Sequence, residues 1–255
     1  AYEIRPRDWS SDVCSSDLVR FVASKGRTAK GYGYQSLVIR KALVDSGRYK
    51  SYADLKGLKI AQGAAGVGTW SVLNELAKTG GVNFSDITQI YMAFPQMAPA
   101  LKTGAIDGSV MNEPFKTLVA REGVAVDMGT TDDVFPDYEL SLILFGDRFR
   151  KERPDVARRF MRAFLRGARD YNDALANGRW RTDGKADEVI SIFARRTGQP
   201  ADLIRAITPP ASDPDGAMRL ESVRKDLAFF RQTGEVTSAS LTVTFWKPCS
   251  SIVTV

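Results

Sequence analysis

The stretch GLKIAQGAAGVGTWSVLNEL, residues 57–76, decides the fold class. A short apolar run at 58–61 predicts a buried strand, and a loop with three glycines follows at 63–69. Apolar side chains then recur at helical spacing, and the pair Gly80-Gly81 ends the predicted helix. A strand, a glycine loop and a helix in this order predict the beginning of a βαβ unit.

The same alternation continues on both sides of this stretch. Strands are predicted at 19–23, 36–40, 87–92, 106–111, 124–126 and 138–144. Helices are predicted at 96–102, 115–121, 155–175, 186–195, 202–207 and 218–232. We therefore expect an α/β fold with right-handed βαβ units, a mostly parallel sheet covered on both faces, and a helical C-terminal section.

Histidine is absent from all 255 residues, which excludes Ser-His-Asp and Cys-His nucleophile pairs and the common histidine-containing zinc sites. Enzymes that use only Asp, Glu, Lys or Tyr stay possible, but no paired motif indicates one. No apolar run approaches the roughly 20 residues that a membrane-spanning helix needs. We expect no metal, no cofactor and no catalytic residues.

The formal net charge is +6, and its most visible cluster is Arg158, Arg162, Arg166 and Arg169 on one side of a predicted amphipathic helix. No aromatic interleaving or nucleic-acid motif accompanies these arginines. We interpret them as a solvated face and expect no nucleic-acid partner.

Both ends of the chain read as foreign. Residues 8–18, DWSSDVCSSDL, are similar to a translated sequencing adapter, with a disordered native tail as the alternative. Residues 245–255 lose the register expected of a closing helix, so we expect a frameshift near Thr244. Because Cys14 and Cys249 lie in these segments, the cysteine count carries no disulfide or redox information.

The glycine loop is the first candidate binding site. Glycines let backbone N–H groups approach a ligand, and the following helix N-terminus offers unpaired donors to an anion or carbonyl. Its spacing matches neither G-x-G-x-x-G nor the phosphate loop, so nucleotide binding is unsupported. A plain tight turn is the alternative interpretation.

Asn112-Glu113-Pro114 is the second candidate, because it follows a predicted strand at the end where ligands of open α/β sheets bind. Alternatively, Glu113 caps the helix that follows. A third, aromatic set could wall a small-molecule cleft or simply pack: Tyr32, Tyr34, Trp70, Phe94 and Phe115.

Three strings resemble one family: DLKGLKIA at 54–61 with its glycine loop, ALKTGAID at 100–107, and NEP at 112–114. Together they are similar to the periplasmic solute-binding proteins of ABC transporters for nitrate, alkanesulfonates, taurine and thiamine-pyrimidine precursors. The likeness extends over about residues 19–243. Since the family often has an aromatic residue before its Glu-Pro pair, Asn112 leaves the solute class open.

The resemblance implies a type II, two-lobed periplasmic-binding-protein fold that closes over a small solute and presents it to a membrane permease and its ATPase. Residues 55–137 would form the second lobe, and 19–54 with 138–244 the remainder of an N-terminally truncated first lobe. The protein would be a periplasmic monomer whose signal peptide is missing from this fragment. Carried over by position, the ligand-binding residues would be Gly66, Val67, Gly68, Thr69, Trp70, Asn112, Glu113 and Tyr34.

Two alternatives stay open at this stage. An enzyme of the same fold, of the thiamine-pyrimidine or menaquinone-pathway type, is one; the former type relies on an active-site histidine that this chain lacks. The other is a ligand-sensing module that uses the same clamp.

Overall fold

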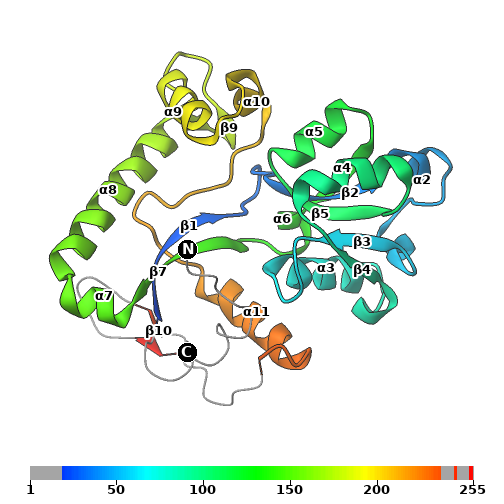
Figure 1. Ribbon diagram of the computed structural model, residues 1–255, viewed down its shortest axis with the longest axis horizontal. Helices are drawn as coiled ribbons and strands as arrows, with labels where there is room; N and C mark the ends of the chain where they lie inside the picture. The colour runs from blue at the N-terminus through cyan, green and yellow to red at the C-terminus, as the bar shows by residue number, and fades with distance from the viewer. Residues whose placement is uncertain (1–18, 237–243, 246–252, 255) are drawn as a thin grey trace, which may run out of the picture.

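The structure is a computed structural model, and it describes residues 19–236, 244–245 and 253–254 of the chain. Figure 1 shows two bodies side by side, with β1 (Val19–Arg27) and β7 (Glu139–Gly146) running from one toward the other. The body that holds these two strands is called the first body. The body built on a five-stranded sheet is called the second body.

The second body has the sheet order β4-β3-β5-β2-β6. Its strands are β2 (Gln35–Arg40), β3 (Lys59–Gln62), β4 (Thr88–Tyr91), β5 (Gly108–Asn112) and β6 (Ala125–Thr130). Its longer helices are α3 (Gly68–Thr79), α4 (Phe94–Thr103) and α5 (Phe115–Arg121). Shorter turns of helix are α2 (Lys41–Asp45), η1 (Tyr52–Leu55), η2 (Phe84–Asp86) and α6 (Thr131–Val134).

The sheet is mixed: β3, β4, β5 and β6 run in one direction, so the expectation of a mostly parallel sheet is confirmed except at β2. β3 is parallel to β4 and β5, but β2 is antiparallel to both β5 and β6. The reason is the path of the chain, which enters the second body on β2, moving away from the first body, and must return. The C-terminal ends of β3, β4 and β5 therefore point toward the first body, beside the start of β2.

Apolar side chains of α3 build one core of the second body. Val72, Leu73 and Leu76 are at most 1% exposed and pack with Ile39 and Ile60 of the sheet. Each buried side chain of this size contributes about 1.5–3 kcal/mol. A second cluster around Met97 and Leu101 of α4 covers the other face. The amphipathic spacing predicted for residues 69–76 is thus explained by burial against the sheet.

The first body combines the antiparallel pair β1 and β7 with helices. It contains α7 (Asp147–Glu152), α8 (Pro154–Asp173), α9 (Asp187–Thr197), α10 (Ala201–Ala206) and α11 (Leu220–Gln232). β10 (Thr244–Phe245) lies beside β1, and β11 (Val253–Thr254) beside β10. On α8, Ala157, Met161 and Ala168 are buried while the arginines are exposed, as predicted.

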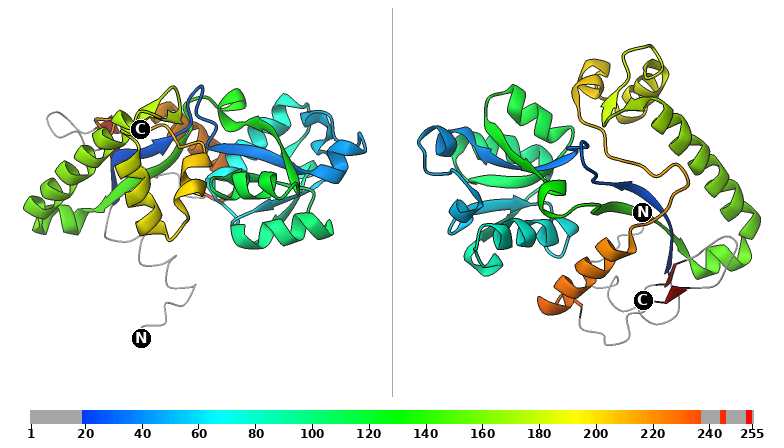
Figure 2. Two further views of the ribbon diagram at one scale, coloured as in Figure 1. Left: turned by 90° about the horizontal axis from the view of Figure 1, so that it is seen from above. Right: turned by 180° about the vertical axis from the view of Figure 1, so that it is seen from behind.

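The predicted helix at 155–175 ends two residues early. Asn177 (φ 50°) and Gly178 (φ 73°) turn the chain, so that β8 (Leu175–Ala176) pairs with β9 (Arg179–Trp180). The segment from α10 to α11 then passes along β1, where the N–H groups of Arg27 and Ala211 each donate to the other residue's carbonyl (Figure 2).

The expected division into lobes stays a prediction. β2 lies inside the five-stranded sheet, which favours starting the second lobe near Gln35 instead of at Leu55. Residues 1–18 and nearly all of 245–255, expected to be foreign, lie outside the described residues, as do Cys14 and Cys249.

Candidate functional site

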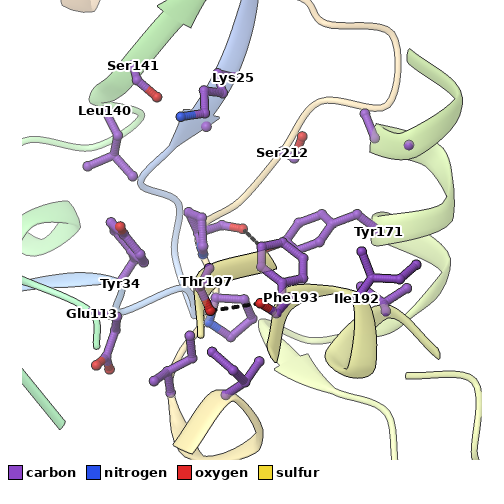
Figure 3. A pocket seen from close by; sticks show the side chains of 18 of the residues that line it. Lys25, Tyr34, Glu113, Leu140, Ser141, Tyr171, Ile192, Phe193, Thr197 and Ser212 are labelled. Carbon is purple, nitrogen blue, oxygen red and sulfur yellow. Dashed lines mark hydrogen bonds between the residues drawn. The ribbon is translucent and has the colours of Figure 1, made fainter. Parts of the chain in front are cut away.

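A cavity of about 820 Å³ lies between the two bodies (Figure 3). The second body contributes Tyr34, Asn112, Glu113, Pro114 and Phe115. The first body contributes residues of β1, β7, α8, α9 and the segment between α10 and α11. Its volume lies within the range of about 300–1,000 Å³ that is usual for small-molecule sites.

Strand register brings three of the predicted site residues together. Gln35 at the start of β2 is opposite Asn112 at the end of β5, and its amide nitrogen donates to Asn112 Oδ1 at 2.7 Å. One residue outward on each strand, the Glu113 N–H donates to the Tyr34 carbonyl at 3.0 Å. Tyr34, Asn112 and Glu113 therefore line the cavity as one group.

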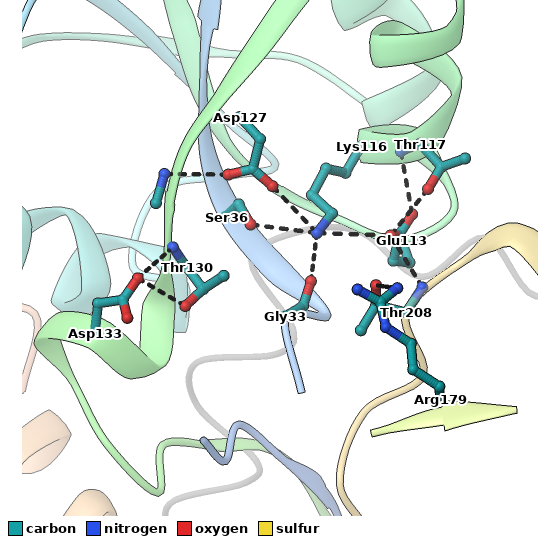
Figure 4. Close-up of polar contacts among 11 residues, drawn as sticks. Gly33, Ser36, Glu113, Lys116, Thr117, Asp127, Thr130, Asp133, Arg179 and Thr208 are labelled. Atoms are coloured by element: carbon teal, nitrogen blue, oxygen red, sulfur yellow. Dashed lines mark hydrogen bonds and ion pairs between the residues drawn. The ribbon is translucent and has the colours of Figure 1, made fainter. Parts of the chain in front are cut away.

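The carboxylate of Glu113 is held by the protein itself. It is 4% exposed and accepts from the backbone N–H of Thr117 (3.1 Å), the Thr117 hydroxyl (3.0 Å) and the backbone N–H of Thr208 (3.2 Å) (Figure 4). The first two contacts satisfy donors in the first turn of α5, as the capping interpretation expects. The third ties the segment between α10 and α11 to the second body.

Lys116 supports the same corner of the cavity. Its ammonium is nearly buried, donates to the Gly33 carbonyl, and lies 3.3 Å from both Ser36 Oγ and Asp127 Oδ2 and 3.6 Å from Glu113 Oε1 (Figure 4). The hydrogen bond from Lys116 to the Gly33 carbonyl holds the loop that carries Tyr34. Burial, and then the negative charge of Glu113, raise the pKa of Tyr34, so its hydroxyl is a neutral donor at physiological pH.

Aromatic side chains from the first body form the opposite wall. The Tyr171 hydroxyl donates to the Pro210 carbonyl at 2.6 Å, and Trp180 Nε1 donates to the Ile204 carbonyl at 2.7 Å. Because these polar atoms are already paired, the two side chains offer mainly apolar surface. Phe164, Ile192 and Phe193 complete this wall.

Sequence reasoning did not identify this aromatic wall. The signal was present on α8, where Phe164 and Tyr171 lie on the apolar side of the helix. That side was interpreted only as a buried face, and nothing in the sequence indicated that β8 and β9 would turn α9 back toward α8.

The glycine loop lies elsewhere. None of the residues Gly66, Val67, Gly68, Thr69 and Trp70 lines the cavity. A Cβ added at Gly68 would lie 2.0 Å from the Tyr138 hydroxyl, and one added at Gly66 would lie 3.2 Å from Glu235 Oε2. The Trp70 ring packs against Phe84 and Tyr91 at centroid distances of 5.7 and 6.2 Å.

A buried carboxyl accompanies this loop where α11 packs on α3. Asp226 of α11 accepts a hydrogen bond from the Ser71 side chain, and its Oδ1 has no hydrogen-bond partner within the described residues. Burial raises the pKa of Asp226 to about 7, although the contact with Ser71 acts in the opposite direction.

In the part of the chain that the structure describes, no group of three or more Cys, Asp or Glu side chains could hold a metal ion. No helix among the described residues is long and apolar enough to cross a membrane.

Comparisons with known proteins agree on the family and the fold. The family model described as "NMT1/THI5 like" matches residues 34–176. The alkanesulfonate-binding protein SsuA from Xanthomonas axonopodis pv. citri, bound to MOPS, is 16% identical, with 86% of this chain and 70% of that chain covered and a TM-score of 0.62. The periplasmic nitrate-binding protein NrtA from Synechocystis PCC 6803 is 14% identical, with 88% and 62% covered and a TM-score of 0.65.

An enzyme shares the fold as well. The desulfurization enzyme DSZB is 15% identical, with 86% of this chain and 74% of that chain covered and a TM-score of 0.54. No curated protein sequence matches the chain.

The expected periplasmic-binding-protein-like α/β fold is confirmed by the solved structures. Whether the predicted site residues bind a ligand stays a prediction.

Proposed function

Because the chain belongs to the NMT1/THI5-like family, we propose that it is the solute-binding component of an ABC-type importer. One observation carries this proposal: the cavity takes walls from both bodies, which are joined through β1 and β7. A solute that contacts both walls would favour the closed arrangement, because contacts from both bodies are made only there.

Three contacts support the idea that the two walls are mechanically linked. Glu113 of the second body accepts from the Thr208 N–H, and Arg179 of β9 donates to the Thr208 hydroxyl at 3.1 Å. The segment that contains Thr208 also pairs with β1 at Arg27 and Ala211. A movement of the second body is thereby transmitted to the strand that lines the other side of the cavity.

The finer parts of the proposal concern partners and location. The loaded, closed form would be recognised by a membrane permease that works with an ATPase, and the protein would act as a monomer in the periplasm. The named SsuA and NrtA relatives support these parts, since one binds an alkanesulfonate or MOPS and the other is a periplasmic nitrate-binding protein.

A panel of solutes tests the binding role. Thermal unfolding is followed with nitrate, taurine, alkanesulfonates, aromatic sulfonates and pyrimidines, each at several concentrations. For a binding protein, at least one class should raise Tm in a concentration-dependent way. At a solute concentration about one hundred times Kd, the free energy of unfolding should increase by about 2.7 kcal/mol. Small-angle scattering of the stabilised form should show a more compact particle; an unchanged radius would refute closure.

Delivery is tested with any permease and ATPase that the genes next to this one encode. Reconstituted in liposomes, their ATP hydrolysis should rise with loaded protein and not with solute alone. No response from any neighbouring transporter would refute the importer role.

The likeness to DSZB favours an enzyme as the second candidate. Biphenyl-2-sulfinic acid, which a DSZB structure contains, is a suitable compound for this alternative. Its consumption with turnover by this chain would favour the enzyme, whereas binding without conversion would favour the solute-binding role.

A further inference from the structure

One end of the cavity carries a positive charge that no residue within the described ranges compensates. Lys25 lies on β1, and no ion pair or side-chain hydrogen bond joins it to any residue that the structure describes. Lys116, which contacts Glu113 but does not line the cavity, is instead committed to Gly33, Ser36 and Asp127. Among the residues that the structure describes, Lys25 is thus the one basic residue of the lining, and it has no partner there.

Two hydroxyl groups accompany Lys25. β7 pairs with β1 so that Ser141 is opposite Gly26, and the segment at Ala211 pairs with β1 at Arg27 on the way to Ser212. Lys25, Ser141 and Ser212 therefore come from three neighbouring segments, and all three line the cavity. Figure 3 shows them around one end of it. A cation flanked by hydroxyl donors is suited to an anionic group.

Two carboxylates, Glu113 and Asp170, also line the cavity. Glu113 already accepts from Thr117 and Thr208, and Lys116 lies nearby. Asp170 is exposed on α8 and shares its helix face with Arg166, four residues earlier. Neither carboxylate is left as a buried, unpaired anion.

The rest of the cavity is suited to a large apolar body. Tyr171 and Trp180 have paired their polar atoms with backbone carbonyls, and Phe164 and Phe193 are apolar throughout. A nitrate ion would leave most of the 820 Å³ without contacts. An aromatic body would remove this surface from water and gain roughly 25 cal/mol for each Å² buried.

We propose that the solute is an organic anion with an aromatic body, whose negative group lies against Lys25, Ser141 and Ser212 and whose rings lie against the aromatic wall. This inference rests on the proposed solute-binding function. Lys25 would then select for the negative charge of the solute, and the aromatic wall would select for its size.

Four probes measure charge and size separately by isothermal titration calorimetry: naphthalenesulfonate, its neutral isostere naphthalenesulfonamide, taurine and nitrate. We expect naphthalenesulfonate to bind at least about tenfold more tightly than each of the other three. Nitrate or taurine binding as tightly as naphthalenesulfonate would overturn the proposal, because the apolar wall would then contribute nothing.

The role of Lys25 is tested with Lys25→Met, which keeps the aliphatic stem and removes the charge. It should weaken naphthalenesulfonate binding by about tenfold and leave the sulfonamide within about twofold, while Lys25→Arg retains most of the affinity. Lys50→Met, an exposed lysine of the second body away from the cavity, is the matched control and should change neither. Equal losses for both probes with Lys25→Met would show a structural role only.

The role of the wall is tested at Gly167, which lines the cavity on α8. A Cβ added there meets no atom within 4 Å, so the side chain of Gly167→Leu begins in open space and should extend into the cavity, and the substitution improves helix propensity. We expect an unchanged or higher Tm and at least about tenfold weaker naphthalenesulfonate binding, with a smaller loss for Gly167→Ala. Unchanged binding in Gly167→Leu would place the probe outside this cavity.

The same experiments separate the two proposals. If nitrate, taurine or a pyrimidine binds and Gly167→Leu abolishes that binding, the solute class is wrong and the solute-binding function stands. If neither these probes nor the wider solute panel binds, both proposals fail.

Discussion

The glycine loop and the Glu-Pro turn differ in what fills the space beside them. At the loop, the volume next to Gly68 is occupied by the Tyr138 hydroxyl, which belongs to the protein. At the turn, Tyr34 and Asn112 face an open cavity. Both segments follow strands of one sheet, and both were predicted to bind a ligand. Glycines in a loop indicate that another group lies close to the backbone. That group can be a side chain of the protein itself instead of a ligand.

The largest expected effect is at Gly68. Gly68→Ala should lower the free energy of unfolding by about 3 kcal/mol, because its Cβ would lie 2.0 Å from the buried Tyr138 hydroxyl. Urea unfolding measures this, with Gly63→Ala as the matched control, since its nearest contact is a roomy 3.9 Å.

Tyr138→Phe sharpens the same comparison, because it removes the hydroxyl and should restore most of the stability of Gly68→Ala. If Gly68→Ala alone costs nothing, the loop has open space beside it and a ligand-binding role for Gly68 regains support.

A smaller loss is expected at the turn. Glu113→Ala removes the acceptor for three donors and should lower the free energy of unfolding by about 2–3 kcal/mol, whether or not solute is present. Glu122→Ala, an exposed ion-paired position, is the control and should cost less than about 0.5 kcal/mol. A normal stability combined with lost solute binding would show that Glu113 is primarily a ligand-binding residue.

Next in size is a pH dependence at the contact of α11 with α3. The pKa of Asp226 is raised to about 7 in the folded protein, so the folded state holds a proton that the unfolded state releases near its ordinary value. Asp226 therefore contributes most to the free energy of unfolding below about pH 4, where it is protonated in both states. This contribution is lost as the pH rises through about 7.

Asp226→Asn keeps the contact with Ser71 and removes the charge. The mutant should be more stable than the wild type by about 2 kcal/mol near pH 8, and the difference should vanish near pH 4. Urea unfolding at both pH values measures it; a difference that does not change with pH would contradict this assignment.

The smallest effect is expected at Tyr34. Its hydroxyl has no hydrogen-bond partner within the described residues, so Tyr34→Phe should change the free energy of unfolding by less than about 0.5 kcal/mol. Tyr171→Phe, which loses the bond to Pro210, should cost about 1 kcal/mol. An equal loss of unfolding free energy in the two mutants would show that the Tyr34 hydroxyl makes a hydrogen bond within the protein.

Much of the fold could be predicted because local patterns decide it. The spacing of Val72, Leu73 and Leu76 and the glycines after α3 predicted that helix, and the helix predicted at 155–175 corresponds to α8. The antiparallel placement of β2 could not be predicted in this way, because it depends on how the chain enters and leaves the second body.

The site was harder to predict, for the same reason. Asn112 and Glu113 were predicted because strand ends carry ligand sites in α/β sheets, and Tyr34 came from the aromatic set and the family resemblance. All three line the cavity. Lys25 was missed because it lies within a strand. Its significance comes from the lack of a partner among the described residues, which only the fold reveals. Phe193 and Trp180 were missed because a two-residue turn at Asn177 places them across from the Glu-Pro turn.

Hydrogen exchange with and without saturating solute, using whichever probe binds most tightly, tests the central claim most directly. We expect slower exchange at the backbone amides of β1 near Lys25, of residues 113–117, and of α8 near Gly167, with residues 63–70 unchanged. Protection confined to residues 63–70 would contradict it and return the site to the glycine loop.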